Sequence, residues 1–116
     1  MIKIENLKGY KLTDKEKLYL LAILQQAEEE KTDTIKTNIY ELDCITETDY
    51  YNKAVQNLKE KNFINYTVKN KDNAYEMLDI TLTKKSLNIL QNNANVVQTD
   101  ALQINAEGKR IITLIL

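Results

Sequence analysis

A fixed order of patterns from Ile39 to Leu90 constrains the fold of this chain more than any other feature of its sequence. Apolar residues recur there first at helical spacing and then in short runs rich in strand formers. A polar turn at Asn70–Asn73 separates the two strand-like runs. The predicted elements are, in order, a helix over 34–42, a helix over 47–61, strands over 63–68 and 75–82, and a helix that begins after Thr83.

A further helix is predicted upstream of these elements, where Thr13 and Glu16 form a capping box. The helix that begins there carries an apolar surface broad enough to contact neighbours on more than one side. Asn62 stands where the 47–61 helix ends, and asparagine often takes the left-handed conformation that closes a helix. Together these patterns predict an α+β fold with a three-helix core and a β-hairpin.

The end of the chain has a different pattern, so we expect residues 1–93 to form the main domain and 94–116 an extension. Two apolar segments, 96–104 and 109–116, flank a loop at 105–108 that contains Gly108. This pattern predicts a C-terminal β-hairpin. Its isoleucine-rich strands are too apolar to remain in water, so we expect the hairpin either to fold onto the domain or to pair with a second copy through its open edge and form a homodimer.

Bulk properties narrow the class of protein. The chain has 116 residues, no histidine and a single cysteine, Cys44, so we expect no disulfide framework and no zinc site. No apolar run reaches the roughly 18 residues of a membrane span, and the N-terminus lacks the pattern of a secretory signal. The sequence therefore predicts a cytoplasmic protein that uses neither metal nor cofactor.

The stretch from Leu12 to Leu90 resembles the winged helix-turn-helix superfamily. The resemblance is carried by a Leu-Thr opening at Leu12–Thr13, by the exit Leu58–Ile64 from the second helix of the motif, and by Leu82–Ser86 after the hairpin. MarR-like transcription regulators are one comparison, and small plasmid- and phage-encoded winged-helix proteins are another. The chain lacks the long terminal helices through which MarR-like proteins dimerise. The resemblance implies a helix and a β-wing that contact DNA.

If the resemblance holds, the second helix of the motif enters the major groove and the wing lies beside it. Asparagine and glutamine can pair with adenine, and lysine can reach guanine or phosphate. Lys69 and Lys71 on the wing, with Lys84 and Lys85 just after it, would form a basic edge beside this helix. Lys59 and Lys61 would extend that edge, and Lys3, Lys8 and Lys11 would form an N-terminal arm. The candidate DNA-binding residues are Thr48, Tyr50, Asn52, Lys53, Gln56, Asn57, Lys69, Lys71, Lys84 and Lys85.

These observations predict a sequence-specific double-stranded DNA-binding protein that regulates transcription or marks a replication or transfer origin. Fifteen lysines against one arginine, with abundant Asn and Ile, indicate AT-rich codons and hence a low-GC bacterium, its plasmid or its phage. Catalysis is disfavoured because the chain has no histidine, only two glycines and no phosphate-binding loop.

Charge keeps a second hypothesis open. Residues 13–93 carry 11 lysines and 14 acidic residues, a net charge of −3, whereas DNA-binding domains tend to be basic. Glu47 and Asp49 would also lie at the tip of the helix that meets DNA. The alternative is a winged helix used as a protein–protein interaction module, either a replication adaptor or a phage protein that targets a host factor.

Overall fold

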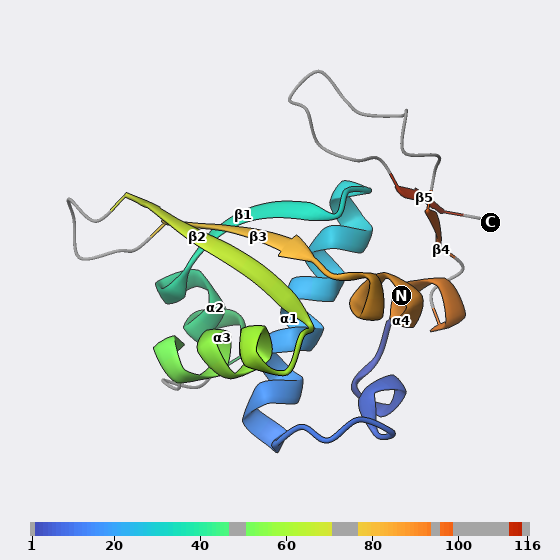
Figure 1. Ribbon diagram of the computed structural model, residues 1–116, viewed down its shortest axis with the longest axis horizontal. Helices are drawn as coiled ribbons and strands as arrows, with labels where there is room; N and C mark the ends of the chain where they lie inside the picture. Colours follow the sequence, from blue (N-terminus) through green and yellow to red (C-terminus); the bar gives the residue numbers. More distant parts are fainter. Residues whose placement is uncertain (1, 47–50, 71–76, 94–95, 99–111, 115–116) are drawn as a thin grey trace.

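The computed structural model describes residues 2–46, 51–70, 77–93, 96–98 and 112–114. Its described residues form an α+β fold in which helices lie on one side of an antiparallel sheet (Figure 1). The elements are η1 (Ile4–Leu7), α1 (Asp14–Glu30), β1 (Thr34–Asn38), α2 (Ile39–Thr46), α3 (Tyr51–Glu60), β2 (Ile64–Asn70), β3 (Met77–Leu82), α4 (Lys84–Asn93), β4 (Val96–Gln98) and β5 (Ile112–Leu114).

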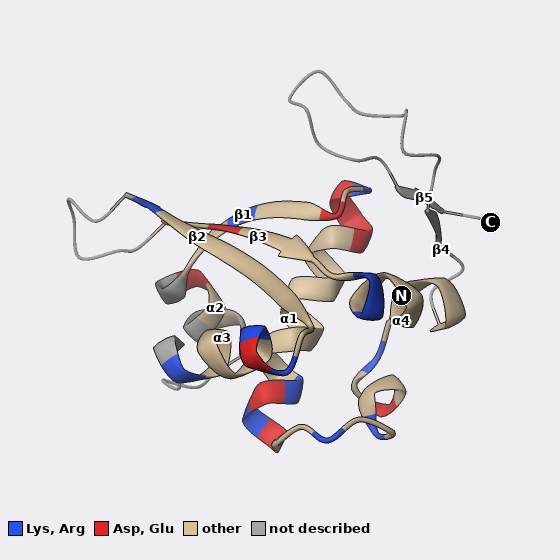
Figure 2. Ribbon diagram, in the orientation of Figure 1, with Lys and Arg blue, Asp and Glu red and all other residues tan. Residues whose placement is uncertain are grey.

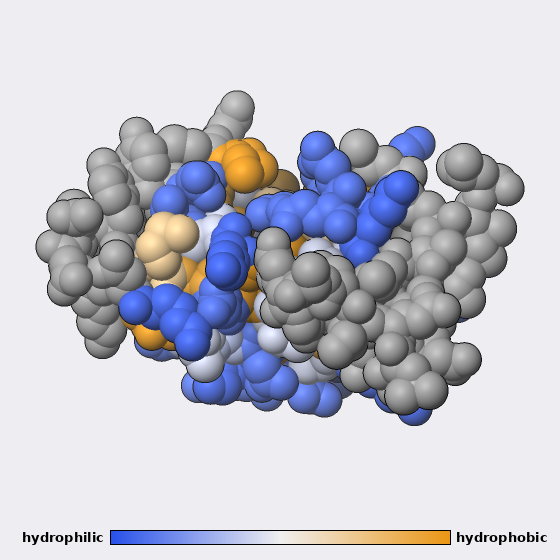
Figure 3. Space-filling model, turned by 90° about the horizontal axis from the view of Figure 1, so that it is seen from above, coloured by the Kyte–Doolittle hydropathy of each residue, from blue (hydrophilic) through white to orange (hydrophobic). Residues whose placement is uncertain are grey.

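The main sheet has the strand order β1-β3-β2, and both of its pairings are antiparallel. Side chains alternate across it, so Ile35, Leu78 and Ile80 are buried against the helices. The opposite face carries polar residues, among them Lys36 and Asp79. Viewed from the side on which the strands lie in Figure 1, the described surface is mostly hydrophilic (Figure 3).

The strand β1 corrects the prediction of a helix over 34–42, because Thr34–Asn38 is extended and only Ile39–Thr46 is helical. The spacing of Ile35, Ile39 and Leu42 fits a helix, but pairing with β3 outweighs that local pattern. The true start of α2 is marked by Asn38, whose Oδ1 accepts a hydrogen bond of 2.7 Å from the Glu41 N–H.

The capping box that opens α1 is confirmed. The Thr13 hydroxyl accepts from the Glu16 N–H at 3.2 Å, and the Glu16 carboxylate accepts from the Thr13 N–H at 3.0 Å. At its other end α1 closes on Lys31, which has a positive φ of 55°. The same left-handed closure occurs after α3 at Asn62, with φ 67°, as the sequence predicts. Lysine has no particular tolerance for this conformation, so Lys31 is the more strained of the two residues.

The predicted hairpin is present as β2 and β3. The register shifts between Val68 and Asn70, opposite Met77 and Leu78, which makes Lys69 the extra residue of a bulge. The helix predicted after Thr83 is also present as α4. In the tail, β4 and β5 pair antiparallel, and the predicted loop at 105–108 lies outside the described residues.

The N-terminal segment, in which Lys3, Lys8 and Lys11 were predicted to form an arm, is held against α1. Ile2 and Leu7 are fully buried. The backbone N–H of Ile2 donates to the Glu28 carboxylate at 3.0 Å, and its carbonyl accepts from the Gln25 amide at 3.1 Å. Lysines 3, 8 and 11 are exposed, but they project from a packed segment.

Candidate nucleic-acid interface

Helix α3 buries one side and presents the other to solvent. Ala54, Val55 and Leu58 are buried in the core, whereas Lys53 and Gln56 are exposed. The buried residues are three and four positions apart, so they form one stripe of the helix. The exposed Lys53 and Gln56 are therefore available to a partner, as the sequence predicts. Asn52 lies in the first turn of α3.

The hairpin brings a second cation, Lys69, toward the same side. Lys69 is exposed near the end of β2, and this end lies on the same side of the molecule as the beginning of α3 (Figure 1). Its Nζ is 4.0 Å from the Asp79 carboxylate on β3, which offsets part of its charge. Lys53, Gln56 and Lys69 form the described part of the candidate interface.

Asn57 does not belong to this exposed surface. It is half-buried, and its amide donates to the Glu16 carboxylate of α1 at 3.0 Å. Lys61 forms an ion pair with the same carboxylate. The structure therefore corrects the placement of Asn57 opposite the buried stripe, because this side chain faces α1 and joins the two helices.

Glu16 is the centre of that junction and is only 1% exposed. Burial raises the pKa of its carboxyl. The hydrogen bond from Lys61, those from the Thr13 N–H and the Asn57 amide, and the charge of Lys61 together outweigh burial and hold the pKa below its ordinary value. Glu16 is therefore ionised at neutral pH and stabilises the contact between the first turn of α1 and the end of α3. The sequence reveals its capping role but not its partners on α3.

The lysines of α4 lie away from the hairpin end. Lys84 and Lys85 are exposed at the start of α4, and Lys85 Nζ donates to the Lys61 carbonyl at 3.4 Å. The same ammonium lies 4.2 Å from the centre of the Phe63 ring. Since Lys69 is near the far end of β2, the length of the hairpin separates it from Lys84. The predicted single basic edge is therefore divided into two groups.

Basic residues as a whole are distributed over many elements rather than gathered on one described face (Figure 2). Blue segments occur on the N-terminal segment, α1, α3, β1, β2 and α4, with acidic segments among them. Three predicted contact residues, Thr48, Tyr50 and Lys71, lie outside the described residues.

None of the described helices is both long enough and apolar enough to cross a membrane. The features of this chain that bear on function are the order of its helices and strands and the polar outer side of α3. No protein-family model, curated protein or solved structure matches this chain.

Proposed function

We propose that this chain is a winged helix-turn-helix protein that binds double-stranded DNA. The observation that carries the proposal is the order α1-β1-α2-α3-β2-β3, with an amphipathic α3 whose outer side is polar. A short strand between the first two helices and a hairpin after the third are typical of winged-helix domains, which the sequence also resembles. In this arrangement α3 is the recognition helix and the β2–β3 hairpin is the wing.

In this proposal the exposed residues of α3 contact bases, and the exposed lysine of the wing contacts phosphate. Lys53 and Gln56 on α3 can read base edges in the major groove. Lys69 on the wing contacts the phosphate backbone, which supplies affinity without sequence information. We infer a homodimer that regulates transcription or marks a site on a mobile element of a low-GC bacterium.

Fluorescence anisotropy across a salt series tests this proposal. The full chain is titrated against duplex from the region flanking its own gene and against a scrambled duplex. We expect specific binding to exceed scrambled binding by about a thousandfold. Equal, weak and steeply salt-dependent binding to both would reduce the function to non-specific contact. A folded protein that binds neither duplex at low salt would refute DNA binding.

A second candidate function, a protein-docking module, is favoured by the way the lysines are used. Glu16 is paired with Lys61, Asp79 lies beside Lys69, and the other described cations are distributed over the surface. A DNA-binding face normally concentrates positive charge. Absence of binding in the anisotropy experiment would favour this module over the DNA-binding protein.

A further inference from the structure

The chain is fixed at the point where it leaves α3. The Thr83 hydroxyl donates to the carbonyls of Asn62 at 2.7 Å and Phe63 at 3.0 Å. The hydroxyl of the buried Ser86 donates to the Phe63 carbonyl at 2.5 Å. Thr83 immediately precedes α4 and Ser86 lies in its first turn. Because hydrogen bonds depend on both distance and direction, these contacts fix the end of α3 relative to α4.

One flank of α3 is held in addition by α1. Lys53, Asn57 and Lys61 stand at positions i, i+4 and i+8, and the Lys61 N–H donates to the Asn57 carbonyl at 2.9 Å as in a helix. The three residues therefore form one row along the helix. The second and third members of this row bind the Glu16 carboxylate, whereas the first, Lys53, is exposed in the candidate interface. The row thus connects a buried contact with α1 to a surface that a partner can reach.

The bonds to Glu16 restrict the rotation of α3 about its own axis. The buried stripe of Ala54, Val55 and Leu58 also faces the core, but the hydrophobic effect is non-directional and tolerates a small rotation. A hydrogen bond weakens steeply as its angle closes. Adjacent residues of a helix point about 100° apart, so a bond that fixes Asn57 also fixes the direction of Gln56.

We propose that Glu16 is a positioning residue for the recognition of DNA by α3, an inference that rests on the proposed DNA-binding function. Glu16 lies on α1, outside the candidate interface, and acts through Asn57 and Lys61. It holds α3 at the rotation at which Lys53 and Gln56 face base edges. Loss of Glu16 therefore reduces discrimination between DNA sequences and leaves the contacts with phosphate, which carry no sequence information.

Anisotropy titrations of full-chain variants against the specific and scrambled duplexes test this role. Glu16→Ala and Asn57→Ala should each lower the ratio of specific to scrambled affinity by about tenfold, as expected for one lost base contact. Asn57→Ala should bind the scrambled duplex with unchanged affinity and salt dependence, because it alters no charge. Glu16→Gln keeps an oxygen for the Thr13 N–H and an amide that can bond Asn57, so it should retain most of the discrimination. Since Glu16→Gln and Glu16→Ala have the same charge, their difference does not arise from release of Lys61.

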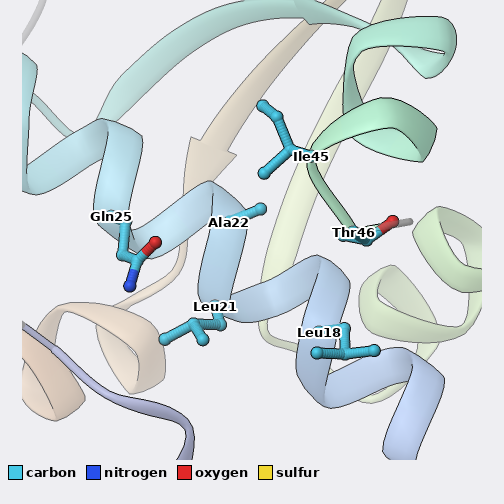
Figure 4. Close-up of a pocket in the computed structure, with 6 residues that line it drawn as sticks. All are labelled: Leu18, Leu21, Ala22, Gln25, Ile45 and Thr46. Carbon is cyan, nitrogen blue, oxygen red and sulfur yellow. The ribbon is translucent and has the colours of Figure 1, made fainter. Parts of the chain in front are cut away.

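Two controls separate positioning from a general loss of stability. Thr13→Ala removes the hydroxyl of the capping box and leaves the bonds from Glu16 to α3 in place. Leu21→Ala removes partly buried apolar packing from the middle of α1. Leu21 lines a shallow pocket between α1 and α2 that Glu16 does not line (Figure 4). Both controls should destabilise the chain and keep its discrimination. Equal losses of discrimination in Thr13→Ala and Glu16→Ala would overturn the proposal, because they would assign the effect to the stability of α1.

A measurement without DNA separates failure of this inference from failure of the proposed function. In amide NMR spectra, Glu16→Ala should shift the backbone signals of Lys53 and Gln56, whereas Thr13→Ala and Glu16→Gln should leave them near their original positions. Unchanged signals in Glu16→Ala would overturn the positioning role whether or not the chain binds DNA. An unaltered chain that binds neither duplex would refute recognition of DNA, while the spectra would still decide whether Glu16 orients α3.

Discussion

Glu16 shows how one side chain can serve both local and tertiary structure. Its carboxylate completes the capping box of α1 and also receives Asn57 and Lys61 from α3. The carboxylate is almost fully buried, whereas the Lys61 side chain is 38% exposed. Removal of the Lys61 ammonium would leave a buried carboxylate, whereas removal of the Glu16 carboxylate would leave a lysine in contact with water. The two removals therefore have unequal effects on stability.

We expect Lys61→Met to destabilise the fold more than Glu16→Gln. Lys61→Met leaves a buried carboxylate without its counterion, at a cost of about 2–3 kcal/mol. Glu16→Gln leaves a lysine that water can reach, at a cost of about 1 kcal/mol. Urea unfolding at pH 7 measures both variants and the double variant. Equal losses from the two single variants would contradict this account.

The lowered pKa of Glu16 also predicts how stability changes with acid. A carboxyl whose pKa is lower in the folded chain than in the unfolded chain stabilises the fold above its unfolded pKa. That contribution is lost as pH falls through the folded pKa. The free energy of unfolding of the unaltered chain should therefore fall more steeply below about pH 4.5 than that of Glu16→Gln. Parallel pH profiles for the two proteins would show that Glu16 is not the responsible group.

Lys31 provides a prediction in the opposite direction, toward greater stability. Its backbone has φ 55°, a conformation that costs a residue with a Cβ about 1 kcal/mol relative to glycine. Lys31→Gly should therefore raise the free energy of unfolding by about 0.5–1 kcal/mol in thermal or urea denaturation. Lys31→Ala is the control, because it removes the charge but keeps the Cβ. A matching gain from Lys31→Ala would assign the effect to charge.

Among the elements, α3 and the β2–β3 hairpin are the proposed contact surface for DNA. Lys53 is exposed on α3, and Lys8 is exposed on the N-terminal segment outside the candidate interface. If α3 enters the major groove of DNA, Lys53→Ala should reduce the slope of the logarithm of affinity against the logarithm of salt concentration by about one. Lys8→Ala should leave that slope unchanged in the same anisotropy titration. Equal effects of the two variants would show that binding is not directed by α3.

Most of these elements could be predicted from local patterns, but β1 could not. The capping box, the left-handed Asn62 and the β2–β3 hairpin depend on neighbours in sequence, and each is present. The residues of β1 have helical spacing with those of α2, and they become a strand only by pairing with β3. The N-cap residue Asn38 was the local signal that separates the two elements.

At the scale of the whole molecule, the candidate interface could be predicted only in part for the same reason. Helical periodicity places Lys53 and Gln56 on the outer side of α3, where they are exposed. It cannot show that Asn57 and Lys61 bond to a carboxylate more than 40 residues away in sequence.

The position of β1 has a consequence for the order in which the molecule assembles. Ile35 pairs with Ile80, so α2, α3 and β2 all lie within the loop that this pairing closes. The β2–β3 hairpin can form from nearby residues, whereas β1 joins only after a long loop has closed. The reverse step, detachment of β1, would uncover one edge of β3 while the hairpin stays intact. Such an opened chain would offer the edge of β3 to other chains, so loss of β1 would give this small fold a route to aggregation.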